Sequence, residues 1–183
     1  MADSRFSPEP LPPATRIACR LEYDGRSFNG WQSQPHEGVL TVQDCLEGAI
    51  AEVAGTEVRV HCAGRTDTRV HGFCQVVHFD PGVSRSPKAW VMGVNANLPP
   101  DVRVHWALPV SADFHARFSA VARRYRYVVA NTAIHPALLV DQVAWHRRPL
   151  DVAAMHAAGQ LLLGERDFSA FRAASCQSAS PMR

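Results

Sequence analysis

The chain has 183 residues, which is enough for one or two compact domains. Hydrophobic residues make up 46% of it and charged residues 20%, which excludes a chain that is mainly a solvated disordered tail. The formal net charge at pH 7 is only +2, so charge alone does not single out a nucleic-acid-binding protein. Lys88 is the sole lysine, either through a coding bias toward arginine or because arginine suits phosphate recognition and base stacking.

The cysteines give no sign of a disulfide framework or a zinc site, because they are odd in number and no two form a CxxC pair. They are Cys19, Cys45, Cys62, Cys74 and Cys176. No signal peptide or transmembrane helix is predicted, since the sequence shows neither a basic-then-apolar start nor a long apolar run. We therefore expect a cytoplasmic protein.

The first residues are rich in proline and lack periodic hydrophobicity, which predicts a flexible leader over residues 1–14. Beyond it, three segments alternate apolar and polar residues with a period of two, and one further segment is apolar on both faces. Such segments are typical of strands. They cover residues 16–23, 58–62, 74–79 and 102–106.

Two helices are predicted between these strands. Apolar residues recur at three- and four-residue steps from Val42 to Val53, and Gly55 can end that helix. A shorter helical pattern covers residues 87–95. The order strand–helix–strand–strand–helix–strand predicts an α+β domain over residues 15–112, with an antiparallel sheet in the ferredoxin-like (split βαβ) arrangement.

In that arrangement the helices cover one sheet face and leave the other open. If the aliphatic residues face the helices, the open face carries five basic side chains, which are Arg20, Arg59, His61, Arg103 and His105. A basic open sheet suits RNA, although a merely solvated face is the commoner explanation of such spacing.

A second unit is expected over residues 113–183. Residues 123–129 are predicted to form a strand, which would place Tyr125 and Tyr127 on one face and at least one of them in the core. Asp151 can cap a helix whose predicted buried stripe consists of Val152, Met155, Leu162 and Leu163. The chain then runs into a polar stretch, so we expect the start of a second, incomplete α+β domain.

The segment from Cys62 to Gly72 carries the residues best suited to chemistry, because loops between strands favour reactive side chains. Asp67 can act as a nucleophile, since carboxylates form covalent intermediates at sugar carbons. Arg65 would favour its ionised form and can also hold a phosphate. From the residues alone, the commoner alternative is a turn with a local salt bridge.

Eleven short motifs in this chain occur in the same order and with similar spacing in one enzyme family. They are Glu22-Tyr23-Asp24-Gly25, Gly30-Trp31-Gln32, Val42-Gln43, Cys62-Ala63-Gly64-Arg65-Thr66-Asp67, Gln75-Val76-Val77-His78-Phe79, Gly93-Val94-Asn95-Ala96-Asn97-Leu98-Pro99, Phe114-His115-Ala116-Arg117-Phe118-Ser119-Ala120, Arg123-Arg124-Tyr125-Arg126-Tyr127, Leu163-Gly164-Glu165, Asp167-Phe168 and Cys176-Gln177-Ser178. The chain closely resembles the TruA family of bacterial tRNA pseudouridine synthases.

The resemblance implies a pseudouridine synthase fold and a reaction that converts uridine to pseudouridine at positions 38 to 40, in the tRNA anticodon stem-loop. It implies that Asp67 is the catalytic aspartate, that Arg65 helps to flip the target nucleotide, and that Tyr125 stacks on the uracil. It also places the basic run from Arg117 to Arg126 in the RNA cleft, with Arg117, Arg124 and Arg126 as RNA-binding residues. The resemblance further implies a homodimer that needs no cofactor and no metal.

Two departures from the family pattern concern the loop and the length. The family usually has a small residue and then glycine after the aspartate, where this chain has Thr68 and Arg69. If the second position requires a positive φ, Arg69 is strained there. The family chain also continues further, so we expect this chain to be C-terminally truncated. An RNA-binding fragment without catalysis and an inert structural domain remain as alternatives.

Overall fold

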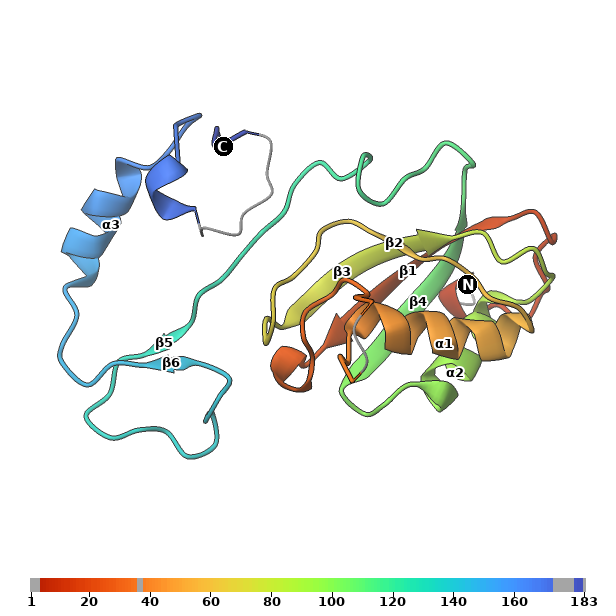
Figure 1. Cartoon of the computed structure of the whole chain (residues 1–183), viewed down its shortest axis with the longest axis horizontal. Coiled ribbons are helices and arrows are strands. Elements are labelled where there is room, and N and C mark those ends of the chain that lie inside the picture. The colour runs from red at the N-terminus through yellow and green to blue at the C-terminus, as the bar shows by residue number, and fades with distance from the viewer. Residues whose placement is uncertain (1–3, 36–37, 173–179, 183) are drawn as a thin grey trace. The chain divides into compact units, whose positions relative to one another are not determined.

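A computed structural model describes residues 4–35, 38–172 and 180–182, and the chain divides into two compact units, Met1–Arg124 and Tyr125–Arg183 (Figure 1). The division lies later than the predicted boundary at residue 113, because the segment after that boundary is bonded to the first unit. The Arg16 guanidinium donates to the carbonyl oxygen of Phe114 at 2.9 Å, and the Ala116 N–H donates to His78 Nδ1 at 3.1 Å.

The first unit is a mixed α+β structure whose element order agrees with the predicted order. Its elements are β1 (Arg16–Tyr23), α1 (Val42–Ala54), β2 (His61–Cys62), β3 (Gly72–Phe79), α2 (Pro87–Asn97) and β4 (Val102–Val110). The strands form one sheet in the order β2-β3-β1-β4, and all neighbouring strands are antiparallel. The helices α1 and α2 pack on one face of this sheet (Figure 1).

The hydrophobic core lies between the sheet and the two helices. Along β1 the alternating residues Ile17, Leu21 and Tyr23 are buried, as the period-two pattern predicts. Leu46 and Ile50 of α1 meet them at helical spacing. The ends of α1 also follow the sequence, because Thr41 caps its first turn and Gly55 ends it with φ of 75°.

The strand predicted at residues 58–62 is much shorter than expected. Val58 and Val60 are buried as the alternation requires, but only His61–Cys62 forms a strand. The reason is a side chain from α1, since the Val60 N–H donates to Glu47 Oε1 at 2.9 Å instead of to a strand. Arg59 pairs with Glu47 as well, at 3.3 Å. Its predicted place on the open sheet face is therefore wrong.

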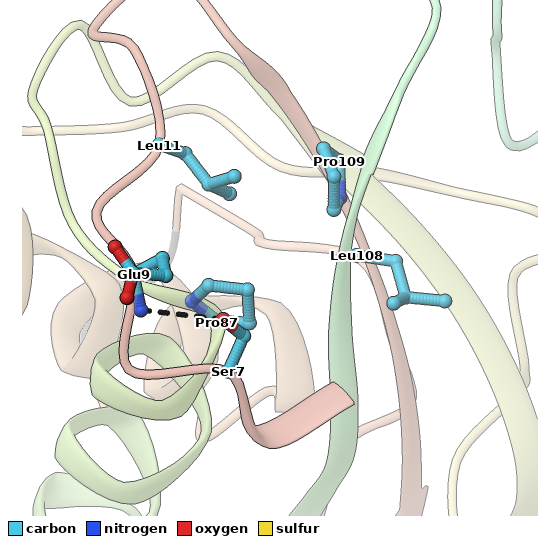
Figure 2. Close-up of a pocket in the computed structure, with 6 residues that line it drawn as sticks. All are labelled: Ser7, Glu9, Leu11, Pro87, Leu108 and Pro109. Atoms are coloured by element: carbon cyan, nitrogen blue, oxygen red, sulfur yellow. Dashed lines mark hydrogen bonds between the residues drawn. The ribbon is translucent and has the colours of Figure 1, made fainter. Parts of the chain in front are cut away.

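The residues expected to be a flexible leader contact the first unit. The Leu11 N–H donates to the carbonyl oxygen of Arg85 at 3.0 Å, and the Lys88 N–H donates to that of Ser7 at 3.1 Å. Together with the start of α2 and with β4 they line a pocket of about 290 Å³, which Figure 2 shows. Its lining residues are Ser7, Glu9, Leu11, Pro87, Leu108 and Pro109, and none of them belongs to the loop between β2 and β3.

The second unit contains a two-stranded parallel sheet of β5 (Val129–Ala130) and β6 (Ala144–Trp145), followed by α3 (Val152–Gln160). The strand predicted at residues 123–129 is wrong for most of its length, because residues 121–128 join no sheet. Asp151 caps α3 as predicted, accepting from the Ala154 N–H at 2.9 Å.

The predicted buried stripe of the helix after Asp151 is also wrong. Its residues Val152 and Met155 are exposed, and α3 ends before Leu162 and Leu163. No element in the described part of the second unit covers these side chains. Across all described residues, no helix combines the length and apolar character needed to cross a membrane.

Candidate active-site loop

The loop that joins β2 to β3 presents Asp67 and Arg65 to solvent. In the described ranges, neither side chain has a hydrogen-bond or ion-pair partner, so the local salt bridge considered as an alternative does not form. Both groups are therefore free to engage a ligand. The loop starts from the β2–β3 ladder, where the Ala63 N–H donates to the carbonyl oxygen of Val76 at 2.8 Å.

Three hydrogen bonds fasten the loop to the end of β1 and to the segment that follows it. The Trp31 N–H donates to the carbonyl oxygen of Thr66 at 2.9 Å, and the Arg69 N–H donates to that of Phe28 at 3.2 Å. The hydroxyls of Tyr23 and Thr66 lie 2.8 Å apart and share a hydrogen bond. Trp31 is buried and anchors this contact. Thr66 and Arg69, which lie on either side of Asp67 in the sequence, are thus held by contacts from outside the loop.

Two glycines allow this close approach. A Cβ at Gly30 would lie 2.7 Å from the Thr66 carbonyl oxygen, and Gly30 also has φ of +90°. A Cβ at Gly25 would lie 2.2 Å from the carbonyl oxygen of Val70. Since real Cβ atoms do not approach backbone oxygen so closely, each glycine provides the space into which the loop packs. Two of the motifs found in the sequence, at residues 22–25 and 30–32, therefore meet at one loop.

Gly72 and Tyr23 make a third close contact at the far end of the loop. A Cβ at Gly72 would lie 2.3 Å from Tyr23 Cε1, so the tyrosine ring packs directly against the backbone of Gly72. This contact, together with the buried aromatic neighbour Trp31 at a ring-centroid distance of 6.0 Å, orients the Tyr23 hydroxyl toward Thr66.

The departure from the family pattern at Arg69 has a structural consequence. Arg69 adopts φ of 66°, in the left-handed region that glycine tolerates and larger residues rarely adopt. The conditional prediction of strain at this position is confirmed. The Val70 N–H donates to the carbonyl oxygen of Asp67 at 3.2 Å and closes the turn around it.

The thiol of Cys62 lies at the end of β2, where the loop begins, and its environment keeps it neutral. Burial raises the pKa of the Cys62 thiol, and the positive charge of Arg65 opposes this only in part. In the described residues the exposed anionic group of the loop is thus the Asp67 carboxylate.

A cluster of rings lies on the side of the sheet where β2 meets β3. His61 stacks on His78 with centroids 5.0 Å apart, and His115 approaches His78 to 4.6 Å. Burial, together with the neighbouring His115 and His61, lowers the pKa of His78 to about 4. Its Nδ1 accepts the Ala116 N–H, which requires that nitrogen to be unprotonated. No group of three metal-ligating side chains suited to a metal ion occurs in the described ranges.

The predicted basic face is largely occupied by internal contacts. Arg20 donates to the carbonyl oxygen of Phe73 at 3.3 Å, and Arg103 donates to that of Pro99 at 2.6 Å. His105 Nε2 lies 3.0 Å from a carboxylate oxygen of Glu22. Most of the positive groups of the sheet therefore have internal partners. The exposed arginines whose side chains make no hydrogen bond or ion pair in the described part of the first unit are Arg65, Arg117 and Arg124.

The remaining predicted site residues divide between the two units. Arg117 lies in the first unit, with its guanidinium 5.6 Å from the centroid of the Phe118 ring. Tyr125 and Arg126 belong to the second unit and are exposed. Tyr125 is 73% exposed and Tyr127 is 86% exposed, so the prediction that one of them lies in the core is wrong. The structure brings Arg65 and Asp67 together in one loop.

Several residues that hold this loop were not predicted to do so from the sequence, and one of them, Arg123, lies in the basic run that the resemblance places in the RNA cleft. Tyr23 and Gly30 stand in quoted motifs, and so do Gln75 and Arg123, but nothing in their spacing shows that they contact residues 63–70. A signal for Tyr23 existed in its burial pattern, since a buried tyrosine needs a partner for its hydroxyl.

Comparisons with known proteins agree on one kind of relative. A family model described as tRNA pseudouridine synthase matches residues 20–119, more than half of the chain. The chain is 59% identical over 169 residues to tRNA pseudouridine synthase A of Alcanivorax borkumensis. The matched region covers 92% of this chain and 63% of that protein. It is 54% identical to the protein of that name from Xanthomonas oryzae pv. oryzae and 55% identical to that from Xylella fastidiosa, each over 168 residues. The chain spans 63–65% of the length of these relatives.

Proposed function

The chain belongs to the tRNA pseudouridine synthase family, and we propose that it isomerises uridine to pseudouridine in the anticodon stem-loop of tRNA, with Asp67 as the catalytic carboxylate. The observation that carries this proposal is that Asp67 and Arg65 are both exposed, with no side-chain partner among the described residues, on a loop held by Tyr23 and Trp31. Tight bracing beneath exposed reactive groups is what precise positioning of a carboxylate requires.

The reaction breaks the bond between C1′ and N1 of the uridine, rotates the uracil, and joins C1′ to C5, while the proton on C5 is lost and N1 gains one. The nucleotide must first leave its stack, which costs a few kcal/mol. We propose that Arg65 fills the vacated space and that Tyr125 stacks on the extracted base, offsetting this cost. Arg117, Arg124 and Arg126 would bind phosphates of the same RNA.

Asp67 can assist the departure of uracil by attack at C1′ or by removal of a neighbouring proton, or it can attack C6 of the ring. Charge that develops at C1′ resembles that in glycoside cleavage, where enzymes also use a carboxylate. The pocket must exclude water, because water at C1′ would release the base by hydrolysis.

The fold and assembly follow from the same proposal. We infer that the first unit is a ferredoxin-like split βαβ domain, supported by the sheet order β2-β3-β1-β4 with α1 and α2 on one face. We also propose that the whole protein acts as a homodimer in the cytoplasm, without a cofactor. Sedimentation of the chain with and without tRNA measures its oligomeric state.

A second candidate function is RNA binding without catalysis. It is favoured by the exposed apolar residues of α3, Val152 and Met155, which lack a covering element in the described part of the second unit. A unit in this state can hold RNA on its arginines and still fail to enclose the target base.

Turnover separates the two candidates, because binding alone produces no pseudouridine. The chain is incubated with an unmodified tRNA transcript and with a transcript whose uridines at positions 38 to 40 are replaced by cytidine. Pseudouridine in the first transcript only supports the synthase and its site. Binding of both transcripts without product supports the second candidate.

A further inference from the structure

We propose that Arg123 is a positioning residue which, with Gln75, clamps the base of the loop that carries Arg65 and Asp67, and that it is not a phosphate ligand like its neighbour Arg124. The proposal rests on the proposed function, which assigns the catalytic carboxylate to this loop. The clamp itself is argued from contacts within the first unit.

The guanidinium of Arg123 is committed to backbone oxygens. Its Nε and one terminal nitrogen both donate to the carbonyl oxygen of Ala63, at 2.9 and 2.7 Å. The same terminal nitrogen donates to the carbonyl oxygen of Arg117 at 3.0 Å. Because guanidinium is planar and its donors form a rigid fork, two bonds to one oxygen fix the direction of that carbonyl. Ala63 is the first residue after β2.

Gln75, from β3, holds the peptide groups on both sides of Gly64. Its side-chain oxygen accepts the Gly64 N–H at 3.4 Å, and its side-chain amide donates to the Gly64 carbonyl oxygen. Gln75 is buried, so its amide has few other conformations available. The peptide groups before and after Gly64 are therefore held by side chains from two different segments, which contain Gln75 and Arg123.

Gly64 lies directly against the arginine. A Cβ at this position would lie 3.2 Å from Arg123 Nε and 3.3 Å from its Cδ, which is tighter than ordinary contact. The absence of a side chain at Gly64 lets the guanidinium reach the Ala63 carbonyl. Arg65 follows at once along the chain, so the clamp sets the direction in which the loop leaves the sheet.

The contrast with Arg124 separates a positioning role from a phosphate-binding role. Arg124 is the next residue and carries the same charge, but it makes no hydrogen bond or ion pair in the described part of the chain. The two arginines are thus matched in charge and in sequence position and differ in their contacts. Substitution of each by alanine removes one positive charge, and only one substitution removes the clamp.

Amide hydrogen exchange tests the clamp without requiring turnover. In Arg123→Ala, we expect the amides of Ala63 and Gly64 to exchange about tenfold faster than in the unaltered chain, a change that corresponds to about 1.4 kcal/mol. Arg124→Ala should leave both rates unchanged, and Arg123→Lys should restore part of the protection because one donor remains. Equal exchange in Arg123→Ala and Arg124→Ala would overturn the clamp.

Two further readouts separate positioning from RNA binding. Arg124→Ala should reduce the slope of log affinity against log salt by about one, whereas Arg123→Ala should leave this slope unchanged. In turnover, Arg123→Ala should lower kcat with little change in KM. A slope reduced by about one in Arg123→Ala would overturn the proposal. If the unaltered chain shows no RNA affinity, the proposed function fails, while the exchange rates still decide the clamp.

Discussion

The packing of Gly30 against the loop gives a prediction whose magnitude follows from geometry. Substitution of Gly30 by alanine has two costs. An L residue in the left-handed region costs about 1–2 kcal/mol, and Gly30 has φ of +90°. The added Cβ would also lie 2.7 Å from the Thr66 carbonyl oxygen and 3.1 Å from the carbonyl carbon of Asp67. Overpacking of this kind costs about 1–3 kcal/mol.

Gly55→Ala is a matched control for the backbone cost. Gly55 has φ of +75°, and a Cβ there would meet nothing within 4 Å. It ends α1, where its N–H donates to the carbonyl oxygen of Ala51 in the same helix. The control should therefore lose about 1–2 kcal/mol of unfolding free energy, and Gly30→Ala should lose about 1–3 kcal/mol more.

Urea denaturation of both variants measures these losses, and turnover measures their effect on the loop. Relief of the clash requires the loop to move, and a displacement of about 1 Å at a catalytic group can cost about 100-fold in rate. We expect Gly30→Ala to lose most activity and Gly55→Ala to retain it at a temperature where both are folded. Equal stability losses and equal activity in the two variants would refute the claim that Gly30 supports the loop.

Three more predictions concern the loop and its surroundings. Arg69→Gly should be more stable than Arg69→Ala by about 1 kcal/mol, because both lose the guanidinium and only glycine relieves the backbone at φ of 66°; thermal unfolding of the pair checks this, and equal melting temperatures contradict it. Tyr23→Phe keeps the ring and loses the hydrogen bond to Thr66, so kcat should fall several-fold and the free energy of unfolding by about 1 kcal/mol; unchanged kcat would remove the hydroxyl from the positioning of the loop. The pKa of His78 is about 4 in the folded chain and 6.5 in the unfolded chain, so the unfolded chain binds more protons between pH 4 and pH 6.5. The free energy of unfolding should therefore fall by at most about 3 kcal/mol as the pH is lowered from 6.5 toward 4. Urea denaturation at several pH values should show that the free energy of unfolding depends less on pH in His78→Leu than in the unaltered chain. An equal pH dependence in the two would contradict this prediction.

The order of elements was predictable from the sequence because local patterns determine it. The alternation along residues 16–23 and the helical spacing from Val42 reflect burial against one core, and Thr41 and Gly55 are local end signals. The length of β2 was not predictable, since it depends on Glu47 reaching the Val60 N–H from a helix distant in sequence. The burial of the stripe of α3 was also predicted incorrectly, because periodicity shows that a face is apolar and does not show what covers it.

The candidate site was predictable in part. The resemblance placed Asp67 and Arg65 on one loop, and the left-handed backbone at Arg69 could be expected from the residue that the family has there. The support beneath the loop was not predictable, because Tyr23, Gly30 and Arg123 reach residues 63–70 through tertiary contacts. Spacing in the sequence carries no record of such contacts.

The most direct test of the central claim is pseudouridine formation by the chain and by two aspartate variants with an unmodified tRNA transcript. Asp67→Ala removes the exposed carboxylate of the loop, and Asp113→Ala removes an exposed carboxylate elsewhere in the first unit as the control. We predict product from the unaltered chain and from Asp113→Ala, and none from Asp67→Ala, with tRNA affinity nearly equal in all three. Product formed by Asp67→Ala at the rate of the unaltered chain would contradict the assignment of Asp67 as the catalytic carboxylate.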